Sequence, residues 1–185
     1  MYLIVGLGNP EEEYANTRHN MGFDVINQIS NKYNINVNKE KFEGLYGTGT
    51  INNEKVILLK PQTYMNLSGE CIIKFKEYYK LETENIIVIY DDMDIEPGNI
   101  KIRKQGGPGG HNGMKSVVQC LKSEKFSRIR IGICKPIEKN NMINYVIGHV
   151  SDEKLKVLNE GINKAAISVE DILKFGIDIA MSKNN

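Results

Sequence analysis

Apolar and polar positions follow one another along the chain in the pattern of an α/β protein. Residues 2–7 form a short, nearly continuous apolar run, which is typical of a strand buried on both faces. Residues 21–33 then place apolar side chains at helical spacing, at Val25, Ile26, Ile29 and Tyr33. A strand followed by a helix is the opening unit of an α/β sheet.

The middle of the chain predicts a hairpin, a helix and a central strand. Residues 45–51 and 56–59 have strand patterns and are joined by the turn Asn52-Asn53, with Pro61 ending the second strand. Apolar residues at helical spacing follow in 72–79. The strongly apolar stretch 86–90 then stops at Asp91 and Asp92, where α/β proteins build sites.

The second half begins with a strand at 100–103, a glycine-rich loop at 106–113 and a helix at 114–121. Residues 128–134 alternate arginine with isoleucine, so one strand face is apolar and the other presents Arg128 and Arg130. A turn is expected near 139–141. Ser151 then supplies a hydroxyl cap for a helical tail that runs to Met181.

Length and composition limit the class of protein. The chain has 185 residues, 41% of them hydrophobic, which suits one domain spanning 1–185. No apolar run approaches the roughly 20 residues of a membrane span, and no secretory signal opens the chain, so a cytoplasmic protein is expected. The cysteines (Cys71, Cys120 and Cys134) are widely spaced among apolar residues, which favours reduced buried thiols over disulfides or a zinc site.

Charge is balanced overall and uneven locally. The formal net charge is +1, yet residues 98–135 contain nine lysines or arginines and one acid, Glu124, for a local balance of +8. The rest of the chain therefore carries −7. Such asymmetry suits a face that binds a polyanion, although solvated charges scattered over helix and strand exteriors would give the same count.

The first loop has two competing interpretations. Gly6-Leu7-Gly8 after a strand suggests a dinucleotide-binding turn, but Glu11 occupies the position of the third glycine and further acids follow it, which would repel a pyrophosphate. The second glycine-rich loop lacks the Lys-Ser or Lys-Thr of a phosphate loop. Neither loop is a convincing nucleotide cradle, and no cofactor is expected.

A hydrolytic site is the better interpretation of these loops. His19 lies just before the first helix and can act as a general base near neutral pH. Asp91 could orient it, with Asp92 and Asp94 as rivals. The serine-hydrolase elbow is missing, and the histidines and cysteines lack metal-ligand spacing. We therefore expect a metal-free site in which a histidine activates water.

Asparagines at element boundaries are the candidates for substrate binding. Asn9 follows the first strand, Asn66 lies in the segment TYMNLSG, and Asn112 follows His111 at the end of the glycine loop. Each could cap a helix or a turn instead. If the loops gather at one sheet edge, their amides could hold a carbonyl and donate to a developing oxyanion.

The motifs that carry these residues resemble those of the bacterial-type peptidyl-tRNA hydrolases. They occur in the family's order, as GLGNP (6–10), YANTRHNMG (14–22), PQTYMNLSG (61–69), DDMDIEPGNIKIR (91–103), GGHNGMKS (109–116) and RIRIGI (128–133). The resemblance implies a monomeric enzyme that cleaves the ester between a peptide and the ribose of tRNA. With the element pattern, it predicts a single-domain, three-layer α/β fold whose mixed, mostly parallel, twisted sheet is flanked by helices.

The resemblance also assigns roles to residues of this chain. It implies His19 and Asp91 as the catalytic pair, and it places Tyr14 and Met65 beside Asn9, Asn66 and Asn112 in substrate binding. It implies tRNA phosphate contacts at Lys101, Arg103 and Arg130, all within the +8 segment. Asn20 and His111 lie in matching motif segments without an implied role.

The chain departs from the family's usual pattern at Asn27, Tyr90, Asp92 and Arg103, and none of these departures removes a proposed catalytic group. Two alternatives stay open on the sequence. One is a non-catalytic RNA-binding protein on the same scaffold, and the other is a nucleotide-dependent oxidoreductase, which the acids at 11–13 oppose.

Overall fold

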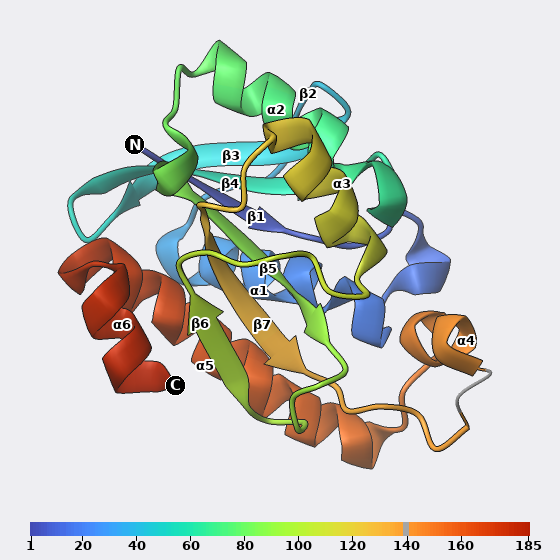
Figure 1. Ribbon diagram of the computed structural model, residues 1–185. Helices are drawn as coiled ribbons and strands as arrows, with labels where there is room; N and C mark the ends of the chain where they lie inside the picture. Colours follow the sequence, from blue (N-terminus) through green and yellow to red (C-terminus); the bar gives the residue numbers. More distant parts are fainter. Residues whose placement is uncertain (139–140) are drawn as a thin grey trace.

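The computed structural model describes residues 1–138 and 141–185, and it contains one mixed seven-stranded sheet (Figure 1). The strands are β1 (Tyr2–Gly6), β2 (Lys39–Lys41), β3 (Gly44–Ile51), β4 (Glu54–Pro61), β5 (Ile86–Asp92), β6 (Ile100–Arg103) and β7 (Ser127–Gly132), in the spatial order β2-β3-β4-β1-β5-β7-β6. The pairings of β1 with β4, β1 with β5, and β5 with β7 are parallel. The other pairings are antiparallel, so only β3 and β6 run against the common direction of the sheet.

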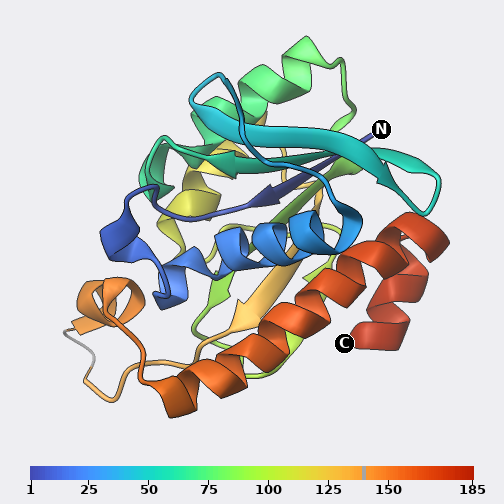
Figure 2. The same cartoon turned by 180° about the vertical axis from the view of Figure 1, so that it is seen from behind.

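Helices cover both faces of this sheet. They are α1 (Met21–Tyr33), α2 (Ser68–Tyr78), α3 (Asn112–Leu121), α4 (Met142–Ile147), α5 (Asp152–Phe175) and α6 (Ile177–Asn184). Short 3-10 turns occur at η1 (Glu12–Tyr14), η2 (Arg18–Asn20), η3 (Met65–Leu67) and η4 (Thr83–Asn85). Figure 2 shows α1 and α5 on one face, with α2 and α3 behind the sheet. The result confirms a three-layer, single-domain α/β fold.

The core is split by the sheet because strand side chains alternate between its faces. Ile4, Ile87 and Ile129 pack with α1 and α5, whereas Leu3, Val5 and Val88 pack with α2 and α3. All six side chains are fully buried. The continuous apolar runs of β1 and β5 therefore reflect burial on both faces, as the sequence pattern predicts.

Several predicted elements are confirmed with small shifts in their ends. The hairpin of β3 and β4 turns at Asn52 and Asn53, both with positive φ, as a tight hairpin turn requires. Helix α3 begins two residues earlier than its apolar spacing indicates, at Asn112. The turn expected near 139–141 falls on Lys139 and Asn140, which lie outside the described residues.

Other details of the prediction are wrong. Strand β2 and helix α4 have no clear apolar period and were not expected. The helical tail divides at Gly176, whose φ of +87° lies outside the helical region. Ser151 begins α5 without a side-chain capping bond to any described residue. Of the three free cysteines, Cys71 is buried, while Cys120 and Cys134 are partly exposed.

Two glycines let α1 approach the ends of the central strands. A Cβ on Gly6 would lie 2.0 Å from the carbonyl oxygen of Gly22, and one on Gly22 would lie 2.5 Å from that of Ile89. Neither has a positive φ, so close approach rather than an unusual turn is the reason for glycine here. The contact brings η2, which immediately precedes α1, to the carboxyl end of β5.

The antiparallel pair of β6 and β7 carries four cations on one face. Lys101 lies opposite Arg130 and Arg103 lies opposite Arg128, and directly paired residues share a face. We call this set the basic strand face. The other face consists of isoleucines packed into the core with α5. None of the helices in 1–138 and 141–185 is long and apolar enough to cross a membrane.

Candidate active site

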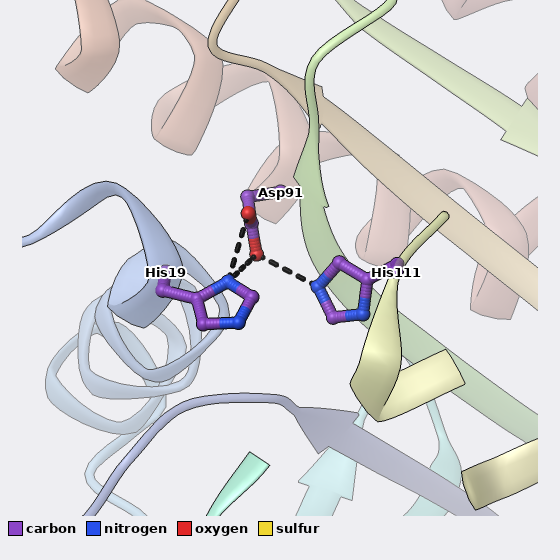
Figure 3. A group of neighbouring side chains, drawn as sticks. All are labelled: His19, Asp91 and His111. Atoms are coloured by element: carbon purple, nitrogen blue, oxygen red, sulfur yellow. Dashed lines mark hydrogen bonds and ion pairs between the residues drawn. The ribbon is translucent and has the colours of Figure 1, made fainter. Parts of the chain in front are cut away.

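His19 and Asp91 meet at the carboxyl end of the sheet. Nδ1 of His19 lies 2.9 Å from each carboxylate oxygen of Asp91 (Figure 3). His19 comes from η2, and Asp91, only 3% exposed, lies near the end of β5. The Nδ1–H of His19 donates a hydrogen bond to this carboxylate, so Nε2 of the neutral ring keeps its lone pair. Figure 3 shows Nε2 on the side of the ring away from Asp91.

The rival acids are engaged elsewhere. Oδ2 of Asp92 accepts from Nε of Arg130 at 2.6 Å, and its Oδ1 accepts from the backbone N–H of Asp94 at 2.7 Å. The carboxylate of Asp94 pairs with Lys135 at 2.9 Å. Asp91 is therefore the acid that orients His19.

Burial and charge act against each other on this pair. Burial by itself lowers the pKa of His19, but the charge of Asp91 and its hydrogen bond outweigh burial and raise that pKa above its ordinary value. Burial by itself raises the pKa of Asp91, whereas His19 and His111 hold it below its usual range. Asp91 is consequently ionised at neutral pH.

A second histidine binds the same carboxylate. Nε2 of His111 lies 2.9 Å from Oδ1 of Asp91, and its Nδ1 accepts from the backbone N–H of Met114 at 3.2 Å. Figure 3 shows both imidazoles directed at Asp91, one from η2 and the other from the start of α3. The two rings lie with centroids 4.9 Å apart.

Nitrogen and oxygen atoms of these three side chains lie within 4.8 Å of one another, a donor set of the kind that holds divalent transition metals. The bond from Met114 opposes that use. A neutral histidine that binds a metal through Nε2 needs its proton on Nδ1, but Nδ1 of His111 already faces an N–H donor. The trio fits hydrogen bonding better than metal binding.

Asn9 is held by Asn20, the residue after His19. The backbone N–H of Asn9 donates to Oδ1 of Asn20 at 2.8 Å, and Nδ2 of Asn20 donates to the Asn9 carbonyl at 2.9 Å. The side-chain oxygen of Asn9 accepts from the backbone N–H of Met65 at 2.8 Å. Its Nδ2 has no hydrogen-bond partner among the described residues, so the amide is oriented with its donors free.

The other candidate substrate residues occupy different surroundings. Met65 is buried, and its sulfur and the ring of His111 both pack against Gly113. Asn66 is exposed on η3, and η3 packs against α3. Asn112 is the first residue of α3 and is also exposed. Tyr14 ends η1 beside the acidic residues 11–13. The structure thus brings the segments that carry Asn9, Asn66 and Asn112 together at one sheet edge.

A cavity of about 600 Å³ extends from the histidines to the basic strand face. We call it the His19 cavity. His19, Asp91, His111 and Asn112 line one end, and Arg103, Arg128 and Arg130 line the other. Apolar side chains of α4 line it too, and Arg18 holds α4 in place, with its guanidinium 3.9 Å from the centre of the Tyr145 ring.

The predicted phosphate-binding residues differ in their exposure. Lys101 is exposed on β6 and does not line the His19 cavity. Arg103 and Arg130 do line it and are partly exposed, and Arg130 is paired with Asp92. Nε of Arg130 makes that pair, and its two Nη groups have no hydrogen-bond acceptor among the described residues.

Arg128 was expected on the surface beside Arg130, and this expectation is wrong. It shares the face but is only 2% exposed, and it donates to the carbonyls of Gly107 at 3.1 Å and Glu124 at 3.0 Å. Its guanidinium also lies 4.2 Å from the centre of the Phe126 ring. Alternation indicates which face a side chain takes but not whether a loop covers that face.

Sequence reasoning assigned no role to His111 or Asn20. Both lie beside predicted site residues, and a second histidine near a single orienting acid was the available signal for His111. The cavity-lining residues of α4, such as Met142 and Ile143, gave no such signal because they belong to a helix that the apolar pattern does not reveal.

Fold and site together define an α/β protein with a histidine–aspartate pair in a cavity that continues into a basic face. The sequence model of the peptidyl-tRNA hydrolase family matches residues 3–185, so the chain belongs to that family. Peptidyl-tRNA hydrolases from Clostridium botulinum (strain Alaska E43 / Type E3) and Caldanaerobacter subterraneus are each 52% identical over 100% of this chain, covering 96% and 100% of those proteins. The crystal structure of peptidyl-tRNA hydrolase from Acinetobacter baumannii matches with a TM-score of 0.93 and 38% identity, over 99% of this chain and 93% of that one.

Proposed function

We propose that this protein hydrolyses the ester bond between a peptide, or an N-blocked amino acid, and the 3′ ribose of tRNA. The family membership supplies the reaction class, and the bond from His19 to Asp91 at 2.9 Å is the observation that carries the chemistry. That bond leaves Nε2 of His19 as the free base. Cleavage recycles tRNA from peptidyl-tRNA released by stalled ribosomes, a role that suits a cytoplasmic monomer.

The reaction begins with removal of a proton from water by Nε2 of His19 while the water oxygen attacks the ester carbonyl. Asp91 stabilises the imidazolium that forms. The proton then passes from His19 to the departing 3′ oxygen of the ribose, so that acid and free tRNA leave with the histidine neutral again. No further co-reactant is needed for the atoms to balance.

Asn9 is proposed as a donor in this reaction. Its oxygen already accepts from the backbone of Met65, so the Nδ2 hydrogens are the part that can bind a carbonyl oxygen or the developing oxyanion. Asn66 and Asn112 are exposed and can supply the acceptor for a peptide N–H. A free ammonium would not satisfy that acceptor in the same geometry, which gives discrimination against unblocked aminoacyl-tRNA.

The tRNA acceptor arm is proposed to lie along Lys101, Arg103 and Arg130, with its 3′ end entering the His19 cavity. Contacts of this kind position a nucleic acid without reading its sequence. Residues 98–135 are strongly basic while the rest of the chain is acidic, which favours binding on this side only.

The test is an ester-release assay on N-acetylated aminoacyl-tRNA with the purified protein and no added metal or cofactor. We expect rapid release from the blocked substrate and slow release from the unblocked aminoacyl-tRNA. Binding without turnover would support the RNA-binding alternative, which the family comparison does not favour, and would refute the proposed hydrolysis. A dependence on added nicotinamide cofactor would point to the oxidoreductase alternative.

A further inference from the structure

His111 is a largely buried polar side chain that the hydrolytic steps above do not use. Its side chain is 9% exposed, and it lies at the N-cap of α3, where it accepts from Met114. The usual cap residues are short, such as serine or aspartate, and an imidazole is not among them. Its other nitrogen, Nε2, lies 2.9 Å from Oδ1 of Asp91, the oxygen that His19 also contacts.

The two contacts of His111 fix the position of its proton. The Met114 N–H can donate only to a nitrogen with a lone pair, so Nδ1 is unprotonated. The single proton of the neutral ring is then on Nε2, directed at Oδ1 of Asp91.

We propose that His111 is a positioning residue, a neutral Nε2–H donor that shares the charge of Asp91 and keeps His19 available as an unprotonated base at neutral pH. The inference rests on the proposed role of His19. It adds a third member to the pair, one that acts on His19 through the Asp91 carboxylate that both imidazoles contact.

The direction in which His111 shifts the pKa of His19 follows from the charge on the Asp91 carboxylate. A hydrogen bond to an ionised carboxylate favours the ionised form and withdraws charge from it. With less charge on Asp91, the His19 imidazolium is stabilised less, and His19 releases its proton at lower pH than it would beside Asp91 alone. Without His111, the full charge of a buried acid would act on His19 and raise its pKa further.

Other charged groups near this trio do not provide the same contact. On the turn of His19, Arg18 directs its guanidinium at Tyr145 of α4. Tyr90 of β5 contacts the His111 ring, with centroids 4.9 Å apart, and Asp92 is paired with Arg130 of β7. Among the described residues, only His19 and His111 bond to the Asp91 carboxylate.

The first measurement concerns the protein without substitution. Ring nitrogen chemical shifts from nitrogen-15-labelled histidine report which nitrogen carries the proton. We expect His111 to be protonated on Nε2 and neutral at pH 7. A proton on Nδ1, or a charged ring at this pH, would overturn the proposal.

The second measurement is the pKa of His19, titrated by NMR in the His111→Asn variant. Asparagine keeps the helix cap to Met114 but is too short to reach Asp91, so helix stability and the carboxylate contact are separated. We expect the His19 pKa to rise by about 0.5–1 unit. An unchanged or lowered pKa in a folded variant would refute the proposed sharing of charge.

A double-variant cycle shows whether the effect passes through the carboxylate. In an Asp91→Asn background, adding His111→Asn should shift the His19 pKa far less than it does in the parent. An equal shift in both backgrounds would mean that His111 acts on His19 directly, against the proposal.

The kinetic consequence has a characteristic pH dependence. For His111→Asn, kcat/KM should fall about three- to tenfold at pH 6, as expected for that shift in pKa, and recover above about pH 8. A loss that is the same at all pH values would indicate distortion instead and would refute the proposal. The titrations need no turnover, so a protein that fails to hydrolyse blocked aminoacyl-tRNA would refute the proposed function while leaving the histidine result to be judged separately.

Discussion

The two ends of the His19 cavity hold their charges in opposite ways. At the histidine end, Asp91 and both imidazoles are largely buried and bonded to one another. At the arginine end, Arg130 is more exposed and is paired with Asp92, while the Arg103 side chain bonds, among the described residues, only to the Ile102 carbonyl. The first arrangement is pre-organised for chemistry, and the second can exchange weak protein partners for phosphate oxygens.

On the proposed function, this difference separates a catalytic end of the cavity from a tRNA-binding end. The pair of Arg130 and Asp92 is partly exposed, with the side chains 26% and 12% accessible, so releasing Arg130 to bind a phosphate costs less than breaking a fully buried pair. Removing one partner from a buried, hydrogen-bonded group costs more because the remaining partner stays without water. Substitutions at the histidine end should therefore change kcat, whereas substitutions of Arg103 or Arg130 at the arginine end should change KM and its dependence on salt.

The largest effect is expected for His19→Ala. Loss of the base should lower kcat by about 10²- to 10⁴-fold, since that is the usual contribution of general acid–base catalysis. Binding of intact tRNA, followed by fluorescence anisotropy, should remain close to that of the parent. His149→Ala is the matched control, because His149 is exposed and does not line the cavity. Turnover within a few fold of the parent would show that His19 is not the base.

Asp91→Asn should have the next largest effect, about 10²-fold or more in kcat/KM, because the imidazolium loses its counter-charge. The pH profile should also move. Asp91 raises the pKa of His19, and burial alone lowers it, so without the carboxylate the acid limb of the profile shifts to lower pH. A limb that moves to higher pH would contradict this account of the pair.

Much of the histidine end could be predicted from the sequence. The strand 86–90 ending in acids and the histidine before a helix are local patterns, and parallel strands bring such ends to one edge. The residue pattern by itself left Asp91, Asp92 and Asp94 open, and the family resemblance implied Asp91. The structure adds the physical reason, because Arg130 pairs with Asp92 and Lys135 pairs with Asp94. The hydrogen bonds of both His19 and His111 to Asp91 likewise join segments distant in the sequence, so the residue pattern alone does not predict them.

The arginine end was less accessible to sequence reasoning. Alternation on β7 gives Arg128 and Arg130 the same face, and both line the cavity, but Arg128 is buried and bonded to the Gly107 and Glu124 carbonyls while Arg130 is partly exposed. Helix α4 was missed because a six-residue helix shows too little of a helical period. Each of these depends on packing between segments distant in the sequence.

Arg130→Gln and Arg128→Gln separate the two roles on one strand. Arg130→Gln should raise KM for intact tRNA substrate about tenfold and lower the slope of binding against salt by about one, as for one lost phosphate contact. A short substrate without the tRNA body should be spared. Arg128→Gln should instead lower the free energy of unfolding by about 2 kcal/mol, since it removes two buried charge-assisted bonds.

Denaturant unfolding and salt titrations of both variants check this contrast. If Arg130→Gln were as destabilising as Arg128→Gln, its role would be in the fold. If Arg128→Gln changed the salt slope without loss of stability, the buried arginine would be in contact with phosphate after all.

The smallest effect is expected for Lys104→Gln. Lys104 is exposed and pairs with Asp178 of α6 at 3.0 Å, so its charge is partly compensated and the pair contributes well under about 1 kcal/mol. The salt slope should change less than in Lys101→Gln, because Lys101 is exposed with no acidic partner among the described residues. Asp178→Asn would release Lys104 and should tighten tRNA binding slightly at low salt. A Lys104→Gln effect equal to that of Arg130→Gln would extend the tRNA contact beyond the cavity to the end of β6.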